Sequence, residues 1–125
     1  MPESRFSVEM VGGVPVIAVP EEIDIANAAE LRAALLHSAA LGTATAVVNM
    51  AGTEFCDSAG LNVLIRAQQR AQAQGGEVRV VMGGAAVRRV FAVTAIDRVL
   101  PTFPSLEEAL APAPAGTISP VSAAD

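Results

Sequence analysis

The chain has 125 residues, is 52% hydrophobic and carries a formal net charge of −5 at pH 7, so it suits one domain that buries roughly two-thirds of its unfolded surface. Its acidic balance and its few aromatic side chains disfavour nucleic-acid binding, which requires a basic surface and, for single strands, stacking platforms. No apolar run approaches the ~18 residues that span a bilayer, and no signal-like segment begins the chain, so we expect a soluble cytoplasmic protein without membrane contact.

The N-terminal part of the chain predicts a β-hairpin. Residues 6–11 alternate loosely between polar and apolar side chains, and residues 14–19 form an apolar run. Gly12 and Gly13, which lie between them, are typical of a two-residue hairpin turn. A loop over residues 20–25 then leads into the first helix.

The spacing of apolar side chains predicts the first helix over residues 28–41, ended by Gly42. Its buried face would hold Ala28, Leu31, Leu35 and Ala39. The only histidine, His37, falls off that face, so we expect it in solvent.

A short apolar strand over residues 45–50 precedes the second helix. Asp57 is its predicted N-cap, because an aspartate carboxylate accepts the free N–H groups of a first helical turn. Ser58 is then the first helical residue and points outward, beside the positive end of the helix dipole, where an added phosphate is tolerated or stabilised. The buried stripe of this helix would hold Leu61, Leu64 and Ile65. Taken without their context, Asp57 and Ser58 are more simply interpreted as two cap residues and nothing more.

Three further positions mark the second helix, which we expect to end near Gln74. Gly60 costs roughly 1 kcal/mol against alanine in a helix, which indicates that some group approaches this turn closely. Gln68 and Gln72 fall in line with the buried stripe, so we expect the last turns to leave the core. Val63 lies opposite the stripe and is either an exposed contact for a partner or an ordinary apolar surface residue.

The last part of the chain predicts one more strand-to-helix unit and a short closing unit. Residues 77–82 form a valine-rich strand, residues 98–100 a short strand and residues 105–110 a helix. The helix after the valine-rich strand would bury Val87, Val90 and Phe91. Residues 112–125 are Pro, Ala, Ser and Gly with little else, so we expect a folded domain over residues 1–111 and a disordered tail.

The order ββαβαβαβα predicts an α/β fold, in which a single mixed β-sheet has an N-terminal hairpin followed by parallel βα units with helices packed against it. The loops that follow the parallel strands then meet at one edge of the sheet. That edge would gather Glu21, Glu22, Asp24, Glu54, Asp57 and Ser58, with Gly83 and Gly84 nearby. An acidic surface around an exposed serine would attract a partner that carries arginine or lysine.

Two motifs resemble a known family. Residues 57–64 read Asp-Ser-Ala-Gly-Leu-Asn-Val-Leu after an apolar strand, which resembles the phosphorylation motif of bacterial anti-sigma factor antagonists of the STAS domain family. Upstream, Glu22-Ile23-Asp24 followed by Ala-Ala-Glu-Leu at residues 28–31 is similar to the segment that leads into the family's first helix. The resemblance spans roughly residues 6–111.

The resemblance implies a switch between two partners. The unmodified antagonist binds an anti-sigma factor that is also a serine kinase, which frees a sigma factor for transcription. The kinase then uses ATP to phosphorylate the motif serine, here Ser58, the antagonist dissociates, and a serine phosphatase resets it. The resemblance implies a STAS-like fold, no enzymatic activity, no metal and no cofactor. The partner-binding residues that it implies are Glu22, Asp24, Asp57, Ser58, Gly60, Asn62 and Val63.

Two residues depart from the family pattern. Glu21 stands where the family often has glycine, which adds an acid to the docking edge. Ala59 replaces the second hydroxyl residue of many members, which leaves Ser58 as the only acceptor in the motif.

Three other functions compete with this one. A serine hydrolase is disfavoured, because the first glycine of its nucleophile motif is absent and His37 precedes the serine. A STAS module that binds a ligand or scaffolds a stress-signalling complex without phosphorylation stays open, as does a structural subunit without a switch. Cys56 is the only cysteine and cannot form an internal disulfide, so we expect it to be a packing residue, with redox sensing as the alternative.

Overall fold

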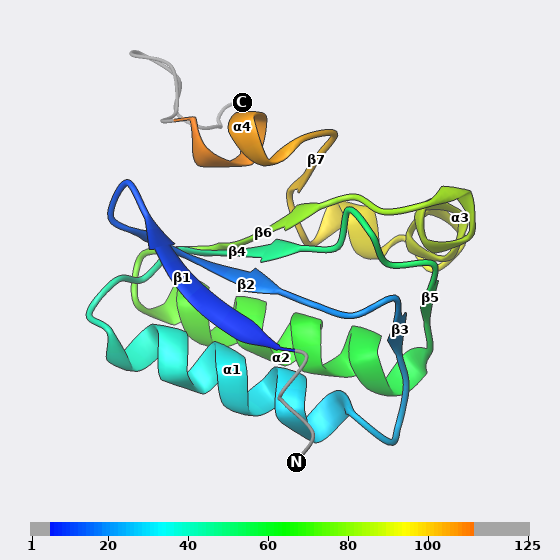
Figure 1. The fold of residues 1–125 in the computed structure, drawn as a ribbon, viewed down its shortest axis with the longest axis horizontal. Coiled ribbons are helices and arrows are strands. Elements are labelled where there is room, and N and C mark those ends of the chain that lie inside the picture. The colour runs from blue at the N-terminus through cyan, green and yellow to red at the C-terminus, as the bar shows by residue number, and fades with distance from the viewer. Residues whose placement is uncertain (1–5, 112–125) are drawn as a thin grey trace.

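A mixed five-stranded sheet runs through the computed structural model, which describes residues 6–111 (Figure 1). In the order β1-β2-β4-β6-β7 its strands are Ser7–Val11, Val14–Ala18, Ala46–Asn49, Val78–Val81 and Thr102–Phe103. β1 and β2 are antiparallel, and each other neighbouring pair is parallel. The predicted α/β fold with an N-terminal hairpin and parallel units is therefore confirmed. The predicted tail, residues 112–125, lies outside the described residues.

The hairpin between β1 and β2 turns at the two predicted glycines. Gly12 has φ 58° and Gly13 has φ 85°, both in the left-handed region that favours glycine. Two positive φ angles in succession are typical of the turn whose twist matches that of the flanking strands.

Helices cover both faces of the sheet (Figure 1). α1 (Ala28–Ala40) and α2 (Ser58–Ala73) lie side by side on one face, and α4 (Leu106–Leu110) lies on the other. α3 (Ala85–Val93) contacts β5 and is followed by the short 3-10 helix η1 (Ile96–Arg98). Among residues 6–111, none of the helices combines the length and the apolar character that crossing a bilayer requires.

The central strands β2, β4 and β6 are mostly apolar because both of their faces are covered; the polar exceptions are Asn49 and Arg79, which are half-buried. Successive side chains of a strand point to opposite faces, so each strand serves two clusters. The larger cluster, under α1 and α2, includes Ile17, Val48 and Val80. The smaller cluster, under α4, includes Val16, Val47 and Val81. Burial on both faces explains why strand patterns appeared here as continuous apolar runs rather than as alternation.

The buried face of α1 differs from the prediction at its last turn. Ser38 is buried there, and its hydroxyl donates a hydrogen bond of 3.0 Å to the carbonyl oxygen of Ala34. Ala39, which we expected on the buried face, is exposed. The next buried residue after Leu35 is therefore Ser38, three positions on, rather than Ala39, four positions on. A serine can be buried there because its hydroxyl is paired with a carbonyl oxygen of its own helix.

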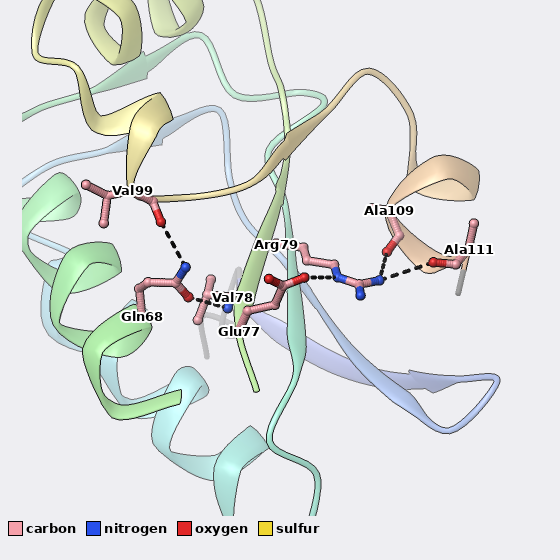
Figure 2. Close-up of polar contacts among 7 residues, drawn as sticks. All are labelled: Gln68, Glu77, Val78, Arg79, Val99, Ala109 and Ala111. Atoms are coloured by element: carbon pink, nitrogen blue, oxygen red, sulfur yellow. Dashed lines mark hydrogen bonds and ion pairs between the residues drawn. The ribbon is translucent and has the colours of Figure 1, made fainter. Parts of the chain in front are cut away.

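The prediction that the last turns of α2 leave the core is wrong at Gln68, which is only 1% exposed. Figure 2 shows its amide joining two other elements: Nε2 donates to the carbonyl oxygen of Val99 at 2.9 Å, and Oε1 accepts the N–H of Val78 at 2.6 Å. A buried amide is stable only when its donors and acceptors are paired, and here the partners come from distant parts of the chain. Gln72, one turn further on, is exposed.

The predicted strand over residues 98–100 is also wrong. The N–H groups of Val99 and Leu100 both donate to the carbonyl oxygen of Ile96, so this segment is a tight helical turn. The turn buries Ile96 and Leu100 on one side, four residues apart, which is a helical rather than a strand spacing. The strand β7 follows at Thr102–Phe103 and pairs with β6.

Arg79 fastens α4 to the sheet, as Figure 2 shows. Its Nε pairs with Glu77 at 2.7 Å, and its Nη1 donates to the carbonyl oxygens of Ala109 and Ala111 at 2.9 and 3.3 Å. The guanidinium also lies over the ring of Phe103, 5.9 Å from its centre. Because the last carbonyls of a helix lack partners within the helix, this arginine both caps α4 and holds it in place.

Candidate functional site

Two short strands that the sequence did not predict form the base of the site. β3 (Glu22–Ile23) and β5 (Phe55–Cys56) pair in parallel as a separate two-stranded ribbon. The N–H of Glu54 also donates to the carbonyl oxygen of Glu21 at 2.7 Å. This ribbon joins the loop after β2 to the loop after β4, although the two loops are far apart in the sequence.

The loop after β6 joins the same edge. The N–H of Gly84 donates to the carbonyl oxygen of Thr53 at 3.2 Å, and the hydroxyl of Thr53 donates to Pro20 at 2.8 Å. A Cβ on Gly83 would collide with the carbonyl oxygens of Met50 and Thr53, so this close approach requires glycine. The predicted meeting of the three loops at one edge of the sheet is confirmed.

Asp57 uses both of its carboxylate oxygens. Oδ1 accepts the N–H groups of Ala59 and Gly60, at 2.9 and 3.2 Å, so the predicted N-cap of α2 is confirmed. Oδ2 accepts the N–H of Ile25 at 3.2 Å. One side chain therefore both starts α2 and ties the β3–α1 loop to it.

Ser58 is the first residue of α2, and its side chain is exposed, as predicted. It borders an open hollow lined by the first two turns of α2 and by Thr94 and Ile96, which follow α3. The hydroxyl is thus displayed on a capped helix, where a partner can approach it without unfolding anything.

The β3–α1 loop, which faces Ser58, is held by its own polar side chains. Asp24 Oδ1 accepts the N–H of Ala26 at 2.9 Å, and Asn27 Oδ1 accepts the N–H of Asp24 at 2.9 Å. Asn27 Nδ2 donates to the carbonyl oxygen of Glu22 at 2.9 Å. These bonds fix Asp24 within the β3–α1 loop, and the bond from the N–H of Ile25 to Asp57 ties that loop to the start of α2.

Gly60 is buried at the first turn of α2. A Cβ there would lie 2.6 Å from Cγ2 of Ile23 and 2.8 Å from Sγ of Cys56. The predicted close approach to this turn is confirmed, and the approaching groups are side chains of the same chain. Because these contacts seat α2 on the β3–β5 ribbon, Gly60 acts on the site by positioning Ser58.

We call Glu21, Glu22, Asp24, Glu54, Asp57 and Ser58 the Ser58 rim. Glu21, Glu22 and Glu54 are exposed, and Asp24 is half-buried. Among residues 6–111, the single ion pair within 4.0 Å joins Arg79 to Glu77, so no rim carboxylate has a described cation as its partner. The rim therefore presents negative charge that a basic partner can neutralise.

The two remaining predicted contact residues differ in exposure. Asn62 is exposed beside the hollow next to Ser58. Val63 is half-buried and packs against the larger core cluster, so it offers a partner less surface than a fully exposed valine would.

Two apolar residues at the rim escaped the sequence analysis. Ile25 is 82% exposed, although its N–H is held by Asp57, and Phe55 is 50% exposed beside Glu22. Exposed apolar side chains beside a charged surface can form the apolar centre of a docking site. In the sequence, the signal for this exposed residue was an isoleucine, Ile25, between Asp24 and Asn27 in the loop that precedes the first helix.

Cys56 is buried, and its contact with Gly60 gives it a packing role. Burial, together with the negative charge of the neighbouring Asp57 carboxylate, raises the pKa of the Cys56 thiol to about 12. The thiolate is the reactive form of cysteine. A buried thiol with a raised pKa is poorly suited to redox sensing.

We expect Cys56 to resist alkylation in the folded protein. With a pKa of about 12, roughly one thiol in ten thousand is ionised at pH 8, against about one in ten for an unfolded chain. Intact-mass measurement with iodoacetamide at pH 8 should show no adduct over an hour in buffer and complete modification in 8 M urea. Rapid labelling of the folded protein would revive the redox alternative.

In the described part of the chain, neither a metal-binding cluster nor the only histidine lies beside Ser58. Within residues 6–111, no three or more His, Cys, Asp or Glu side chains are grouped so that they could hold a metal ion. His37 is exposed in the last turn of α1, as predicted, and it borders a different hollow together with Phe6 and Glu30.

Comparison with known proteins gives consistent matches along the chain. The STAS domain family matches residues 5–109. A curated relative, the anti-sigma-F factor antagonist RsfB of Mycobacterium tuberculosis, is 30% identical over 98 residues, which are 78% of this chain and 80% of that protein.

Solved structures agree with the fold. The crystal structure of an anti-sigma factor antagonist from Mycobacterium paratuberculosis has a TM-score of 0.77 at 32% identity, and the match covers 84% of this chain and 89% of that one. The anti-sigma factor antagonist SpoIIAA, in its unphosphorylated form, has a TM-score of 0.67 at 25% identity, covering 83% of this chain and 91% of that one.

Proposed function

From the premise that this chain belongs to the STAS domain family and, within it, to the anti-sigma factor antagonists, we propose that it binds a serine-kinase anti-sigma factor through the Ser58 rim and so releases a sigma factor. Phosphorylation of Ser58 by that kinase ends the binding, and a serine phosphatase restores it. These antagonists are regulatory proteins rather than enzymes. The proposed switch acts in the cytoplasm.

The observation that carries this proposal is the position of Ser58. Its hydroxyl is exposed on the first residue of a helix that Asp57 already caps, so phosphorylation leaves the hydrogen bonds of the fold in place. A phosphate at this position is also favoured by the helix dipole. The modified protein therefore stays folded, and its altered surface carries the signal.

Binding of the unmodified protein would draw on two features of the rim. Its carboxylates, which have no ion-pair partner among residues 6–111, attract a basic surface and speed association. Ile25 and Phe55 supply apolar area at the centre of the contact, where water is excluded. The hydrogen bonds within the β3–α1 loop hold the backbone around Ile25 in place, which lowers the ordering cost of binding there.

Dissociation of the phosphorylated protein from the kinase would follow from the position of the phosphate at Ser58. Phosphorylation adds a charge of about −1.5 to −2 beside Asp57. Within a kinase active site, this group faces the remaining phosphates of the nucleotide and the acidic residue that accepted the hydroxyl proton. Repulsion at the centre of the contact, together with the cost of removing water from a phosphate, outweighs the attraction at its periphery.

The experiment that tests the switch uses intact mass. The protein is incubated with ATP and each candidate anti-sigma kinase of the same genome, beside the Ser58→Ala variant. We expect one kinase to add a single phosphate to the wild type and none to the variant. Equal modification of the wild type and the variant would remove Ser58 from the mechanism.

A second function stays open under the same family membership. A STAS module that binds its partner without being phosphorylated would use the same rim as a fixed docking surface. It is distinguished by a partner that binds both wild type and Ser58→Ala but transfers no phosphate to either.

We expect Ile25→Ser to weaken partner binding about tenfold while leaving the fold unchanged. Ile25 is 82% exposed, so its side chain contributes little to folding and is available to a partner. Isothermal titration calorimetry against the kinase that modifies Ser58 gives the affinity, and thermal unfolding gives the stability.

The matched control is Met10→Ser, which also removes an exposed apolar side chain but lies on β1, near the hairpin turn. It should bind as the wild type does. Equal losses for the two variants would mean that Ile25 contributes only through general surface hydrophobicity, and unchanged binding of Ile25→Ser would place the apolar centre of the contact elsewhere.

A further inference from the structure

A second hollow lies between the C-terminal halves of α1 and α2, away from Ser58 at the N-terminus of α2. We call it the α1–α2 cavity. It measures about 150 Å³, and it opens to solvent on one side. Its apolar lining includes Leu35, Leu36, Ala39, Ala67, Ala71 and Val78. Alanines on both helices leave room that larger side chains would fill.

The closed end of the cavity is rigid. The loops after α1 and α2 touch there: a Cβ on Gly76 would collide with the backbone of Ala44, and the N–H of Ala46 donates to the carbonyl oxygen of Glu77 at 3.1 Å. Since β4 and β6 begin at these loops, the sheet fixes the floor of the cavity. The space is therefore preformed, as small-molecule sites usually are.

One charged group reaches this apolar space. Arg70 is half-buried and lines the cavity with Thr43 and Gln74. Its guanidinium has no hydrogen bond or ion pair to any other residue of the described range 6–111. Arg70 lies in the last turn of α2, where a positive charge also offsets the helix dipole. That role does not explain why its guanidinium borders a cavity with its N–H donors unused by the residues that the structure describes.

We propose that the α1–α2 cavity binds a small carboxylic acid, with the carboxylate on Arg70 and an apolar body of about six carbons among the alanines and leucines. A cavity of this volume with aliphatic walls accommodates benzene, which sets the size of the body. A guanidinium fork matches a carboxylate in two parallel hydrogen bonds. The full positive charge of Arg70 offsets the partial negative charges of the two helix ends, about −0.5 each, and its guanidinium supplies the directed N–H donors that an anion needs and a cation cannot use.

The test is a titration of the full chain with hexanoate and benzoate, followed by ¹H–¹⁵N NMR and calorimetry. We expect chemical-shift changes at Ala46, Ala67, Ala71 and Val78, and at least tenfold weaker binding of hexanol, which lacks the carboxylate. Arg70→Gln should reduce hexanoate affinity about tenfold, whereas Arg66→Gln, an exposed arginine on the same helix, should not.

Filling the space tests the apolar half of the proposal. Ala71→Leu should abolish hexanoate binding, and Ala39→Leu, at an exposed position of the facing helix, serves if the first variant does not fold. Ser58→Ala should bind hexanoate as the wild type does, because this site is independent of the switch. Absence of shift changes around the cavity, or equal affinities for hexanoate and hexanol, would overturn the proposal.

Discussion

Phosphorylating Ser58 is expected to weaken the complex with the anti-sigma kinase about a hundredfold, which corresponds to about 3 kcal/mol. The phosphate enters the centre of the contact beside Asp57, where it must lose water and face the nucleotide phosphates of the kinase. The measurement is calorimetric titration of purified phosphoprotein and of unmodified protein against the kinase loaded with ADP. Equal affinities would mean that phosphorylation does not operate the switch.

Two variants separate charge from shape at this position. Ser58→Asp adds one negative charge, and we expect about a tenfold loss of affinity, smaller than that of the phosphate because its charge is smaller. Ser58→Asn has nearly the same shape as the aspartate without the charge, and it should bind within twofold of the wild type. Both residues are acceptable at the start of a helix, so thermal unfolding should change little. Equal losses for the two would assign the effect to steric fit.

Gln68→Met is expected to lower the free energy of unfolding by about 3 kcal/mol, which lowers the melting temperature by about 10 to 15 °C for a domain of this size. Methionine fills a similar volume but leaves the N–H of Val78 and the carbonyl oxygen of Val99 without their partner. Chemical denaturation followed by circular dichroism measures the loss.

The control for this variant is Gln69→Met, one position further along the same helix, where the side chain is exposed. It should change the free energy of unfolding by less than about 0.5 kcal/mol. Gln68 joins α2, β6 and the segment before β7. We therefore expect Gln68→Met to shift the unfolding curve of the whole domain as a single transition. A small effect at Gln68 would mean that water replaces both hydrogen bonds.

Much of the site was predictable because its chemistry is local. The cap at Asp57, the outward position of Ser58 and the glycine turn of the hairpin each depend on groups within a few residues. The meeting of the strand-end loops followed from the handedness of parallel connections, which holds in nearly all proteins. The acidic rim around Ser58 was therefore expected from residue order and topology.

Residue order alone thus predicted the local elements and the sheet edge at which Ser58 lies. The pairing of β3 with β5, the burial of Gln68 and the bond from Asp57 to Ile25 became visible only in the folded chain. Caps and turns depend on backbone groups close by in the chain, whereas two-residue strands and buried amides are stable only when distant segments supply their partners. From the sequence, Gln68 is expected at the surface; it can be buried because the fold supplies the N–H of Val78 and the carbonyl oxygen of Val99 as its partners.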